Sequence, residues 1–490
     1  MDKECVMLSN SWLTKYNGHI RFRKIDVDAM SKRKIVIIGA GSASFGPTTL
    51  ATIVRNEALR GSELALVDLD RTAAETAAWV ARRMNESWQA DMTISSTTDR
   101  REALPGATHV VVSIEVAPRE EHWRLDWEIP LRHGLRQPYA ENGGPGGMMH
   151  TFRQVPAHMA IARDMEVLCP DAWLILFSNP LPRLCRAISK YTRVKVVGKC
   201  HQINIGYALA AALLHRDYNI PVPEGVVLHS DPGNAPTIYT LSHAGRKHFE
   251  ITSAGLNHFI WLLDIRDRRT GEDLYPRLRE AIDLAPPTLE PLALELFRTF
   301  GLLPIAGDTH MAEYLPWLHD PVAGPWETYQ LPLYDWTGNE SVREALHSLM
   351  AAMGSGDIPV DGMREAVSEG ATELVEALGD GDSYVDETVN VPNRGAIAGL
   401  PHETIVEVPA YISHTGIRPL QIGALPYPVT ELCRREAALV ELVVDAAVTG
   451  DRSLALQALL LDPMITDIGS ARAILDDYLT TFADYLPQFQ

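Results

Sequence analysis

The sequence predicts an α/β fold whose first part is a doubly wound parallel sheet of the Rossmann type. Three features of the 490-residue chain predict it: an apolar run that enters a glycine-rich turn, a second apolar run that ends on an acidic residue, and further short apolar runs separated by helix-length segments. Strands of a parallel sheet are buried on both faces, so continuous apolar runs are what such a sheet requires.

The first apolar run covers residues 34–38 and leads into a turn that contains Gly39 and Gly41, after which residues 48–55 are predicted as a helix. Gly39 permits the tight turn, and Gly41 lets the backbone approach a pyrophosphate. The helix offers its unpaired amides and positive dipole end to that anion. This stretch therefore predicts a dinucleotide site.

The second run, residues 63–67, ends on Asp68. An acid at this position accepts hydrogen bonds from the adenosine ribose hydroxyls and repels a 2′-phosphate, which favours NAD over NADP. The alternative is a flavodoxin-like glycine turn in which Asp68 and Asp70 cap helices.

Three later runs, residues 109–114, 173–177 and 194–198, are predicted as further parallel strands. Ligands of open α/β sheets bind at the carboxyl ends of strands, and Cys200 and His201 follow the last run closely. Both are therefore candidate site residues. The alternative is a buried thiol that packs as a small apolar side chain beside a histidine without function.

A second imidazole, His258, follows Asn257 in the next part of the chain. A thiolate and an imidazole, with substrate oxygens completing the coordination, suit Mn²⁺, Fe²⁺, Co²⁺ or Ni²⁺. Zinc is the rival, but a closed zinc site needs four protein ligands in compact spacing, which this sequence lacks.

Other segments carry weaker signals. The glycines of residues 141–147 favour either a loop that closes over a ligand or a flexible surface turn. Residues 389–395 and 405–409 are predicted as paired strands, and residues 431–461 as long amphipathic helices.

Composition excludes several functional classes. A net charge of -19 argues against a nucleic-acid partner, because a phosphate backbone requires a basic face. The apolar runs are much shorter than the ~20 residues of a membrane-spanning helix, so we expect no membrane anchor. Five scattered cysteines are too few for a disulfide framework and predict a reducing cytoplasm.

From about residue 32 to 480 the chain resembles glycoside hydrolase family 4, because six short motifs occur in the order seen there. The motifs are Gly39-Ala40-Gly41-Ser42, Ser178-Asn179-Pro180, Cys200-His201, Gly255-Leu256-Asn257-His258, Gly307-Asp308 and Asn390-Val391-Pro392-Asn393. The resemblance implies a Rossmann domain at residues 32–200 and a lactate-dehydrogenase-like α+β C-terminal domain at 201–490, which binds metal and substrate. Residues 1–31 are then an N-terminal extension.

The resemblance also implies a glycosidase that uses NAD and Mn²⁺ or another divalent transition metal, an exception to the two-carboxylate scheme of most glycosidases. Carried over residue by residue, it implies that the metal ligands are Cys200 and His258 and that Asn179 contacts the substrate. The implied cofactor contacts are Gly39, Gly41, Ser42 and Asp68. The implied partner of the protein is a small-molecule glycoside, and we expect the protein to form a homodimer or homotetramer.

In the implied reaction NAD oxidises sugar C3, a base removes the C2 proton, and the C1 leaving group departs by elimination, with the metal as Lewis acid. Asp308 is the first candidate for the base and Tyr314 the second. A tyrosine with an ordinary pKa of ~10 needs a cation to act as a base, whereas an aspartate is already ionised at neutral pH. The alternative for Asp308 is a loop or helix cap.

The residue after the metal cysteine varies among the family's substrate groups. Here His201 and Gln202 stand at positions where the phospho-glycosidase types have Asp or Asn, which favours an unphosphorylated α-hexoside or α-hexuronide. His201 is a candidate acid for the leaving oxygen because its ordinary pKa of ~6.5 allows proton exchange at neutral pH. Asp126 is a less certain acid.

Two other functional classes stay open at this point. An NAD-dependent 2-hydroxyacid dehydrogenase of lactate or malate type shares the fold, but gains nothing from Cys200 or His258. A non-catalytic NAD-binding protein needs neither a metal nor a base. Stoichiometric NADH production would support the first class, and bound NAD without turnover the second.

Overall fold

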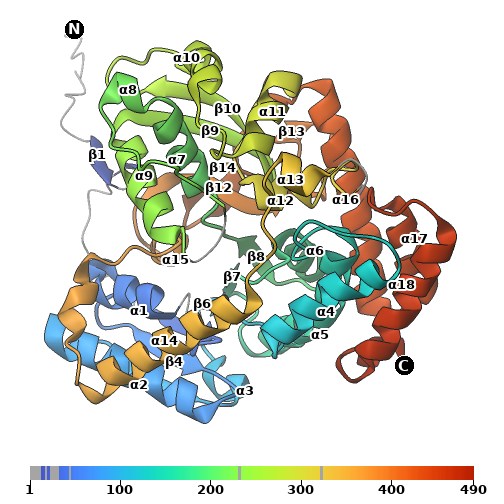
Figure 1. The fold of residues 1–490 in the computed structure, drawn as a ribbon. Coiled ribbons are helices and arrows are strands. Elements are labelled where there is room, and N and C mark those ends of the chain that lie inside the picture. Colours follow the sequence, from blue (N-terminus) through green and yellow to red (C-terminus); the bar gives the residue numbers. More distant parts are fainter. Residues whose placement is uncertain (1–12, 17–18, 23–32, 43–45, 230–232, 320–323) are drawn as a thin grey trace, which may run out of the picture.

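The computed structural model describes residues 13–16, 19–22, 33–42, 46–229, 233–319 and 324–490, and its centre is one large sheet (Figure 1). The parallel strands are β3 (Lys34–Ile38), β4 (Glu63–Val67), β5 (Thr93–Thr97), β6 (His109–Val112), β7 (Trp173–Leu176) and β8 (Lys195–Gly198). Their spatial order, β5-β4-β3-β6-β7-β8, is that of a doubly wound sheet. The predicted Rossmann-type fold is confirmed.

The sheet continues beyond β8 with antiparallel strands from the second half of the chain, in the order β12-β14-β9-β10-β11. These strands are β9 (Phe249–Leu256), β10 (Phe259–Asp267), β11 (Leu303–Pro304), β12 (Ser383–Pro392) and β14 (Ile405–Ser413). The pairing of β12 with β14 confirms the two paired strands predicted near the end of the chain. Antiparallel strands with helices give the α+β arrangement expected for this half.

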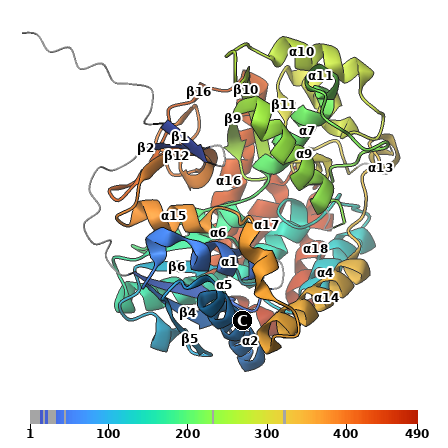
Figure 2. The same cartoon turned by 90° about the vertical axis from the view of Figure 1, so that its left-hand side faces the viewer.

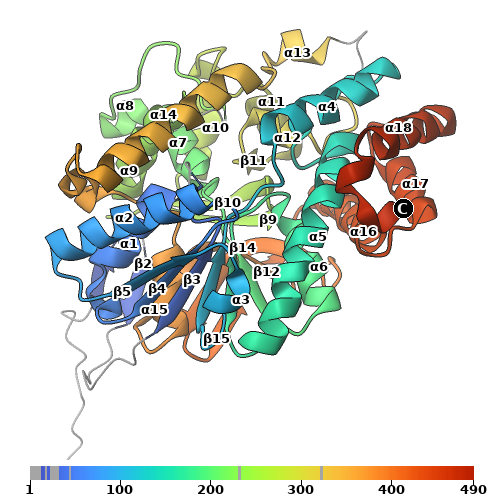
Figure 3. The same cartoon turned by 90° about the horizontal axis from the view of Figure 1, so that it is seen from below.

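The helices are α1 (Gly46–Arg55), α2 (Arg71–Trp88), α3 (Arg100–Ala103), α4 (Arg119–Arg132), α5 (Gly144–Leu168), α6 (Leu181–Tyr191), α7 (Ile203–Leu213), α8 (His215–Tyr218), α9 (Ala235–His248), α10 (Tyr275–Ala281), α11 (Pro291–Phe300), α12 (Asp308–Ala312), α13 (Pro325–Thr328), α14 (Trp336–Ser355), α15 (Ala371–Leu378), α16 (Tyr427–Thr449), α17 (Arg452–Leu461) and α18 (Ile468–Thr481). Helices from the second half pack on the first: α14 lies along α2 (Figure 3), and α16 contacts α5 and α6. None of the helices in the described ranges is long and apolar enough to cross a bilayer.

Strand β3 shows how the sheet is covered on both faces. Ile35 and Ile37 belong to one apolar core, and Val36 and Ile38 to the other. Alternate side chains of a strand point to opposite faces, so an uninterrupted apolar run fills both cores. Ligands of such sheets bind at the carboxyl ends of the parallel strands.

Most of residues 1–31 lies outside the described residues. Strands β1 (Leu13–Tyr16) and β2 (His19–Phe22) form a hairpin, and β2 pairs with β12 (Figure 2). The remaining short strands are β13 (Ile397–Ala398), β15 (Gly416–Pro419) and β16 (Gly423–Ala424).

The glycine-rich residues 141–147 are not a flexible surface turn, because all of them are buried and α5 begins at Gly144. A Cβ atom on Gly143 would lie 2.5 Å from the Glu313 carbonyl oxygen, and one on Gly147 would lie 2.3 Å from the Asn142 carbonyl carbon. The glycines are therefore required by close packing of this segment.

Candidate active site and metal centre

The turn after β3 has the geometry that a dinucleotide site requires. Gly39 has a φ of 86°, and a Cβ atom there would lie 2.2 Å from the Ser113 carbonyl oxygen. A Cβ on Gly41 would lie 2.5 Å from Cβ of Ala73. The Ser42 amide closes the turn by donating to the Gly39 carbonyl at 3.0 Å. Both glycines are thus needed for the backbone to pass this close to its neighbours.

Asp68 lies beside this turn at the end of β4. Its Oδ2 accepts from the Gly41 amide at 2.9 Å. Helix α2 is capped instead by Asp70, whose Oδ1 accepts from the Thr72 amide at 2.7 Å. The cap alternative therefore applies to Asp70, while Asp68 faces the glycine turn, where a bound ribose would lie. These residues fit NAD.

The structure brings Cys200 and His258 together, as expected for a metal pair. Cys200 follows β8, and His258 lies in the two-residue turn between β9 and β10. The Cys200 Sγ and His258 Nε2 atoms are 3.5 Å apart, and both side chains are buried.

Two buried side chains hold the His258 turn in place. His258 has a φ of 61°, a left-handed conformation that costs free energy for a residue other than glycine. Its amide donates to Oε1 of Gln202 at 3.1 Å, and the Asn257 side chain donates to Oε2 of Glu407 at 2.9 Å. Gln202 also donates to Glu407. Gln202, which follows His201 in the sequence, thus helps to fix the turn that carries the metal ligand His258.

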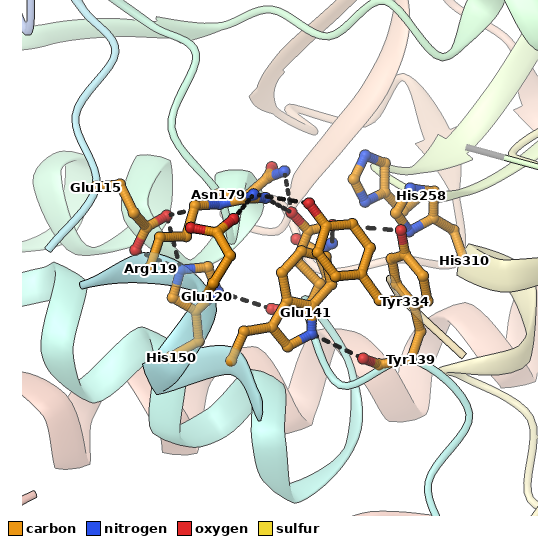
Figure 4. A network of polar contacts seen from close by, with 12 residues as sticks. Glu115, Arg119, Glu120, Tyr139, Glu141, His150, Asn179, His258, His310 and Tyr334 are labelled. Carbon is orange, nitrogen blue, oxygen red and sulfur yellow. Dashed lines mark hydrogen bonds and ion pairs between the residues drawn. The ribbon is translucent and has the colours of Figure 1, made fainter. Parts of the chain in front are cut away.

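Further donor groups lie next to this pair. One ligand atom each from Glu141, His258 and His310 lie within 4.8 Å of one another, and all three residues are buried. The His258 and His310 rings are stacked with centroids 3.9 Å apart (Figure 4). With the Cys200 thiol, this donor set of sulfur, imidazole and carboxylate fits a divalent transition metal.

Asn179 joins the same cluster from the end of β7. Its side-chain amide donates to Oε1 of Glu141 at 3.3 Å, and Arg119 Nη2 donates to the same oxygen at 3.3 Å (Figure 4). Arg119 also donates to the Tyr334 hydroxyl at 3.1 Å and lies 3.8 Å from a Glu115 oxygen. The expected substrate contact therefore lies within a network of paired charges.

Burial sets the protonation of the two predicted ligands. It lowers the pKa of His258 well below its ordinary value, and His310 and His201 lower it further. Burial also raises the pKa of the Cys200 thiol, with Glu407 and Glu369 adding to the rise. The neutral imidazole is ready to bind a metal, whereas the thiol must lose its proton. Metal binding is therefore expected to release a proton.

Asp308 has the contacts of a helix cap. Its two carboxylate oxygens accept from the amides of Leu292 and Ala293, at 2.8 Å each, in the first turn of α11. Burial raises its pKa well above the ordinary value, and the neighbouring Glu290 raises it further. Both carboxylate oxygens are occupied by these two amides, so the contacts favour the cap alternative over the base role.

Tyr314, the second candidate for the base, is also buried. It lines a cavity of about 20 Å³ together with Asn142, Asn257 and Arg183. Burial raises the pKa of Tyr314 well above its ordinary value, and Glu313 adds to the rise. Two of the lining residues are chain neighbours of Glu141 and His258, which places Tyr314 near the donor cluster.

His201 is exposed, and its Nδ1 lies 2.9 Å from Oε1 of Glu369. The Glu369 carboxylate raises the pKa of His201. Asp126, in contrast, is fully buried and forms contacts of 2.7 Å and 2.5 Å with the Arg153 guanidinium. Burial raises the pKa of Asp126, and Arg153 opposes that shift. Its contacts are those of a structural ion pair between α4 and α5.

Sequence reasoning missed His310, Glu141, Glu313 and Glu407. Each lies in or next to a segment that the motifs had marked, but the segments are more than 50 residues apart. The His-x-x-Glu spacing of His310 and Glu313 on and after α12 was the one local signal that could have pointed to a ligand with its supporting carboxylate.

Comparisons with known proteins identify the family of the chain. The sequence profile described as family 4 glycosyl hydrolase matches residues 34–214, and that of the family's C-terminal domain matches residues 253–465. An alpha-glucosidase of Erwinia rhapontici is 31% identical over 477 residues, which cover 88% of this chain and 93% of the relative. An alpha-galactosidase of Bacillus subtilis is 29% identical and covers 94% of this chain and 100% of the relative.

The fold is also found among solved structures. A 6-phospho-alpha-glucosidase from gut microorganisms, solved in complex with NAD and Mn²⁺, superposes with a TM-score of 0.71 at 20% identity, covering 94% of this chain and 100% of that one. Because the two profiles together cover most of the chain, it belongs to family 4 of the glycosyl hydrolases and is a glycoside hydrolase.

Proposed function

We propose that the protein hydrolyses the O-glycosidic bond of an unphosphorylated α-hexoside with the help of NAD and a divalent transition metal such as Mn²⁺. The observation that carries this proposal is the buried Cys200–His258 pair, 3.5 Å apart, at the sheet edge that also carries the glycine turn. When bound there, NAD supplies hydride transfer at sugar C3 and the metal supplies Lewis-acid activation of sugar oxygens.

Each residue of the site has its own role in this reaction. Cys200 and His258 hold the metal, Asn179 contacts the sugar, and Gly41 with Asp68 hold the cofactor. Tyr314 takes the base role, since a neighbouring cation lowers the pKa of a phenol and Asp308 is engaged as a cap. His201 donates the proton to the leaving oxygen, because Glu369 favours its protonated form.

Charge in the site supports a neutral sugar. The carboxylates of Glu115, Glu120 and Glu141 surround Arg119, and Arg343 pairs with Glu120. Both guanidinium groups of this network are therefore occupied by carboxylates, which disfavours a sugar phosphate or a hexuronide. Two of the relatives are named alpha-glucosidase and alpha-galactosidase, whereas others are named alpha-galacturonidase or probable 6-phospho-beta-glucosidase.

A panel of nitrophenyl glycosides tests the substrate class. We expect turnover of an α-glucoside or α-galactoside with NAD⁺, Mn²⁺ and a thiol reductant, and at least ~10-fold lower kcat/KM for the α-galacturonide and for 6-phosphorylated analogues, a difference of about 1.4 kcal/mol in transition-state binding. A preference for an anionic sugar would contradict the charge argument.

The cytoplasm is the inferred compartment. Cys169, Cys185, Cys200 and Cys433 are free thiols, which suits a reducing environment. The homodimer or homotetramer expected from the sequence stays a prediction, which light scattering of the purified protein would test.

A further inference from the structure

Helix α14 comes from the second half of the chain and runs along the edge of the sheet that carries the dinucleotide site. We propose that α14 covers bound NAD and that His347 holds this helix on the glycine turn, so that the cofactor is retained between turnovers. This inference rests on the use of NAD in the proposed function and assigns a helix and a positioning residue to it.

The first argument is the path that a bound cofactor must take. Its ribose would lie at Asp68 after β4, its diphosphate at Gly41 after β3, and its nicotinamide near the metal pair after β8, where the sugar binds. These strands lie in the order β4-β3-β6-β7-β8, so the cofactor follows this edge of the sheet. Helix α14 takes the same course, because it contacts α2, which follows β4, and α4, which follows β6 (Figure 1).

The second argument is that α14 is fixed to the first half of the chain at two separate points. In its first half, Arg343 pairs with Glu120 of α4. At its end, Arg83 of α2 donates to the carbonyl oxygens of Gly354 at 2.8 Å and Ser355 at 2.7 Å. The part of α14 between these two points is therefore held across the sheet edge.

The third argument is a contact between α14 and the glycine turn itself. Nε2 of His347 lies 3.2 Å from the carbonyl oxygen of Gly41, although the two residues are 306 positions apart in the chain. A carbonyl oxygen can only accept, so Nε2 donates this hydrogen bond. Gly41 is the residue whose backbone approaches the diphosphate. The contact thus places the middle of α14 beside the bound cofactor.

A covering helix suits the proposed reaction. That reaction returns NAD to its oxidised form within each turnover, so the cofactor need not leave. A dehydrogenase must exchange its reduced cofactor in every cycle, and a helix held across the site would slow it. We therefore expect slow release of NADH from this protein, with a rate that depends on the hydrogen bond between His347 and Gly41.

Release of NADH from the full-length protein tests this. NADH is bound first, then displaced by excess NAD⁺ in a stopped-flow instrument and followed by its fluorescence. His347→Ala is expected to release NADH ~3- to 10-fold faster, which is the change that loss of one hydrogen bond produces. His347→Gln should stay within ~2-fold of wild type, because its side-chain amide can still donate to the Gly41 carbonyl.

Two further variants and a second readout complete the experiment. Arg83→Met removes the donor at the end of α14 and should also speed release ~3- to 10-fold. The matched control is Ser348→Ala, because the exposed Ser348 hydroxyl donates within its own helix, to the Glu344 carbonyl at 2.9 Å, and its loss should not change the release rate. In wild type, the amides of α14 should exchange hydrogen more slowly once NADH is bound.

The outcomes separate this inference from the proposed function. Equal release rates in wild type and His347→Ala would remove the role of His347, and hydrogen exchange of α14 that NADH does not change would overturn the covering role; either result leaves the NAD-dependent function standing. Failure of wild type to bind NADH would overturn both. If a variant does not fold, hydrogen exchange of wild type still decides whether α14 covers the cofactor.

Discussion

Asp126 was a candidate acid from its place in the sequence, and the structure gives it a structural role that can be measured. Its carboxylate is 1% exposed and makes contacts of 2.7 and 2.5 Å with Arg153, whose side chain is 2% exposed. Asp126→Asn keeps the size but removes the charge, which leaves the guanidinium buried without its partner. Breaking a buried pair in this way costs ~3–5 kcal/mol.

Urea unfolding followed by tryptophan fluorescence measures this loss. With a dependence on urea of ~3 kcal/mol per molar, the midpoint should fall by ~1–1.7 M. The matched control on the same helix is Glu128→Gln, which removes a surface ion pair with Arg124 at 2.6 Å and should cost no more than ~1 kcal/mol.

A second variant separates charge burial from catalysis. Replacing both partners, Asp126→Leu with Arg153→Met, removes the two buried charges together and should recover part of the lost stability. The reasoning is refuted if Asp126→Asn unfolds at the wild-type urea concentration while its turnover falls by ~10² or more, because that pattern belongs to a general acid.

Three other predictions concern single residues of the site and its surroundings. Cys200→Ser should lose metal-dependent turnover yet bind NAD as wild type does, because a hydroxyl is a poorer soft ligand than a thiolate; unchanged turnover at limiting Mn²⁺ would remove Cys200 from the metal site. Asp308→Asn keeps one accepting oxygen but turns an amine towards the other amide of α11, so it should lower the free energy of unfolding by ~1–3 kcal/mol and keep the turnover of the folded enzyme; lost turnover at unchanged stability would restore Asp308 as the base. Burial raises the pKa of Glu436 to about 7, so between pH 4.5 and 7 the folded state holds a proton that the unfolded state releases, and the stability that this proton contributes is lost as the pH rises through that range. The unfolding midpoints of wild type and Glu436→Gln should therefore converge at low pH, and those of the variant should depend less on pH. Parallel curves for the two proteins would contradict the raised pKa.

Much of the first half was predictable because its signals are local. The β3 run with Gly39 and Gly41, the strand that ends at Asp68, and Cys200 after β8 are each contained in about ten residues. In a parallel sheet, chain order and right-handed crossovers fix where strand ends lie, so these residues could be assigned to one edge.

The residues that surround the metal pair could not be predicted in the same way. His310 lies two residues after Asp308, and the start of α12 decides which of them faces the metal pair: Asp308 caps α11 and His310 stacks on His258. Glu141 lies near the same residues although its segment is distant in the sequence and was predicted as a loop or a surface turn. The segment is held there because the amides of residues 141–143 donate to Glu313. Such tertiary contacts leave no periodic pattern in the sequence.

Spacing along the chain shows the same limit. The fold brings Cys200, His258, His310 and Glu141 near one another from four separate segments. The metal preferred by the protein is therefore a question for titration with Mn²⁺, Co²⁺ and Zn²⁺ side by side.

The central claim is that hydrolysis proceeds through reversible oxidation, and one measurement tests it most directly. Cofactor-free protein is given a nitrophenyl α-hexoside in heavy water, with NAD⁺ and Mn²⁺ added separately and together, while nitrophenol and NADH are followed. We predict nitrophenol release only with both additions, no net NADH, and deuterium at C2 of the released sugar. Stoichiometric NADH would indicate a dehydrogenase, and hydrolysis without NAD⁺ that leaves C2 fully protiated would contradict the account.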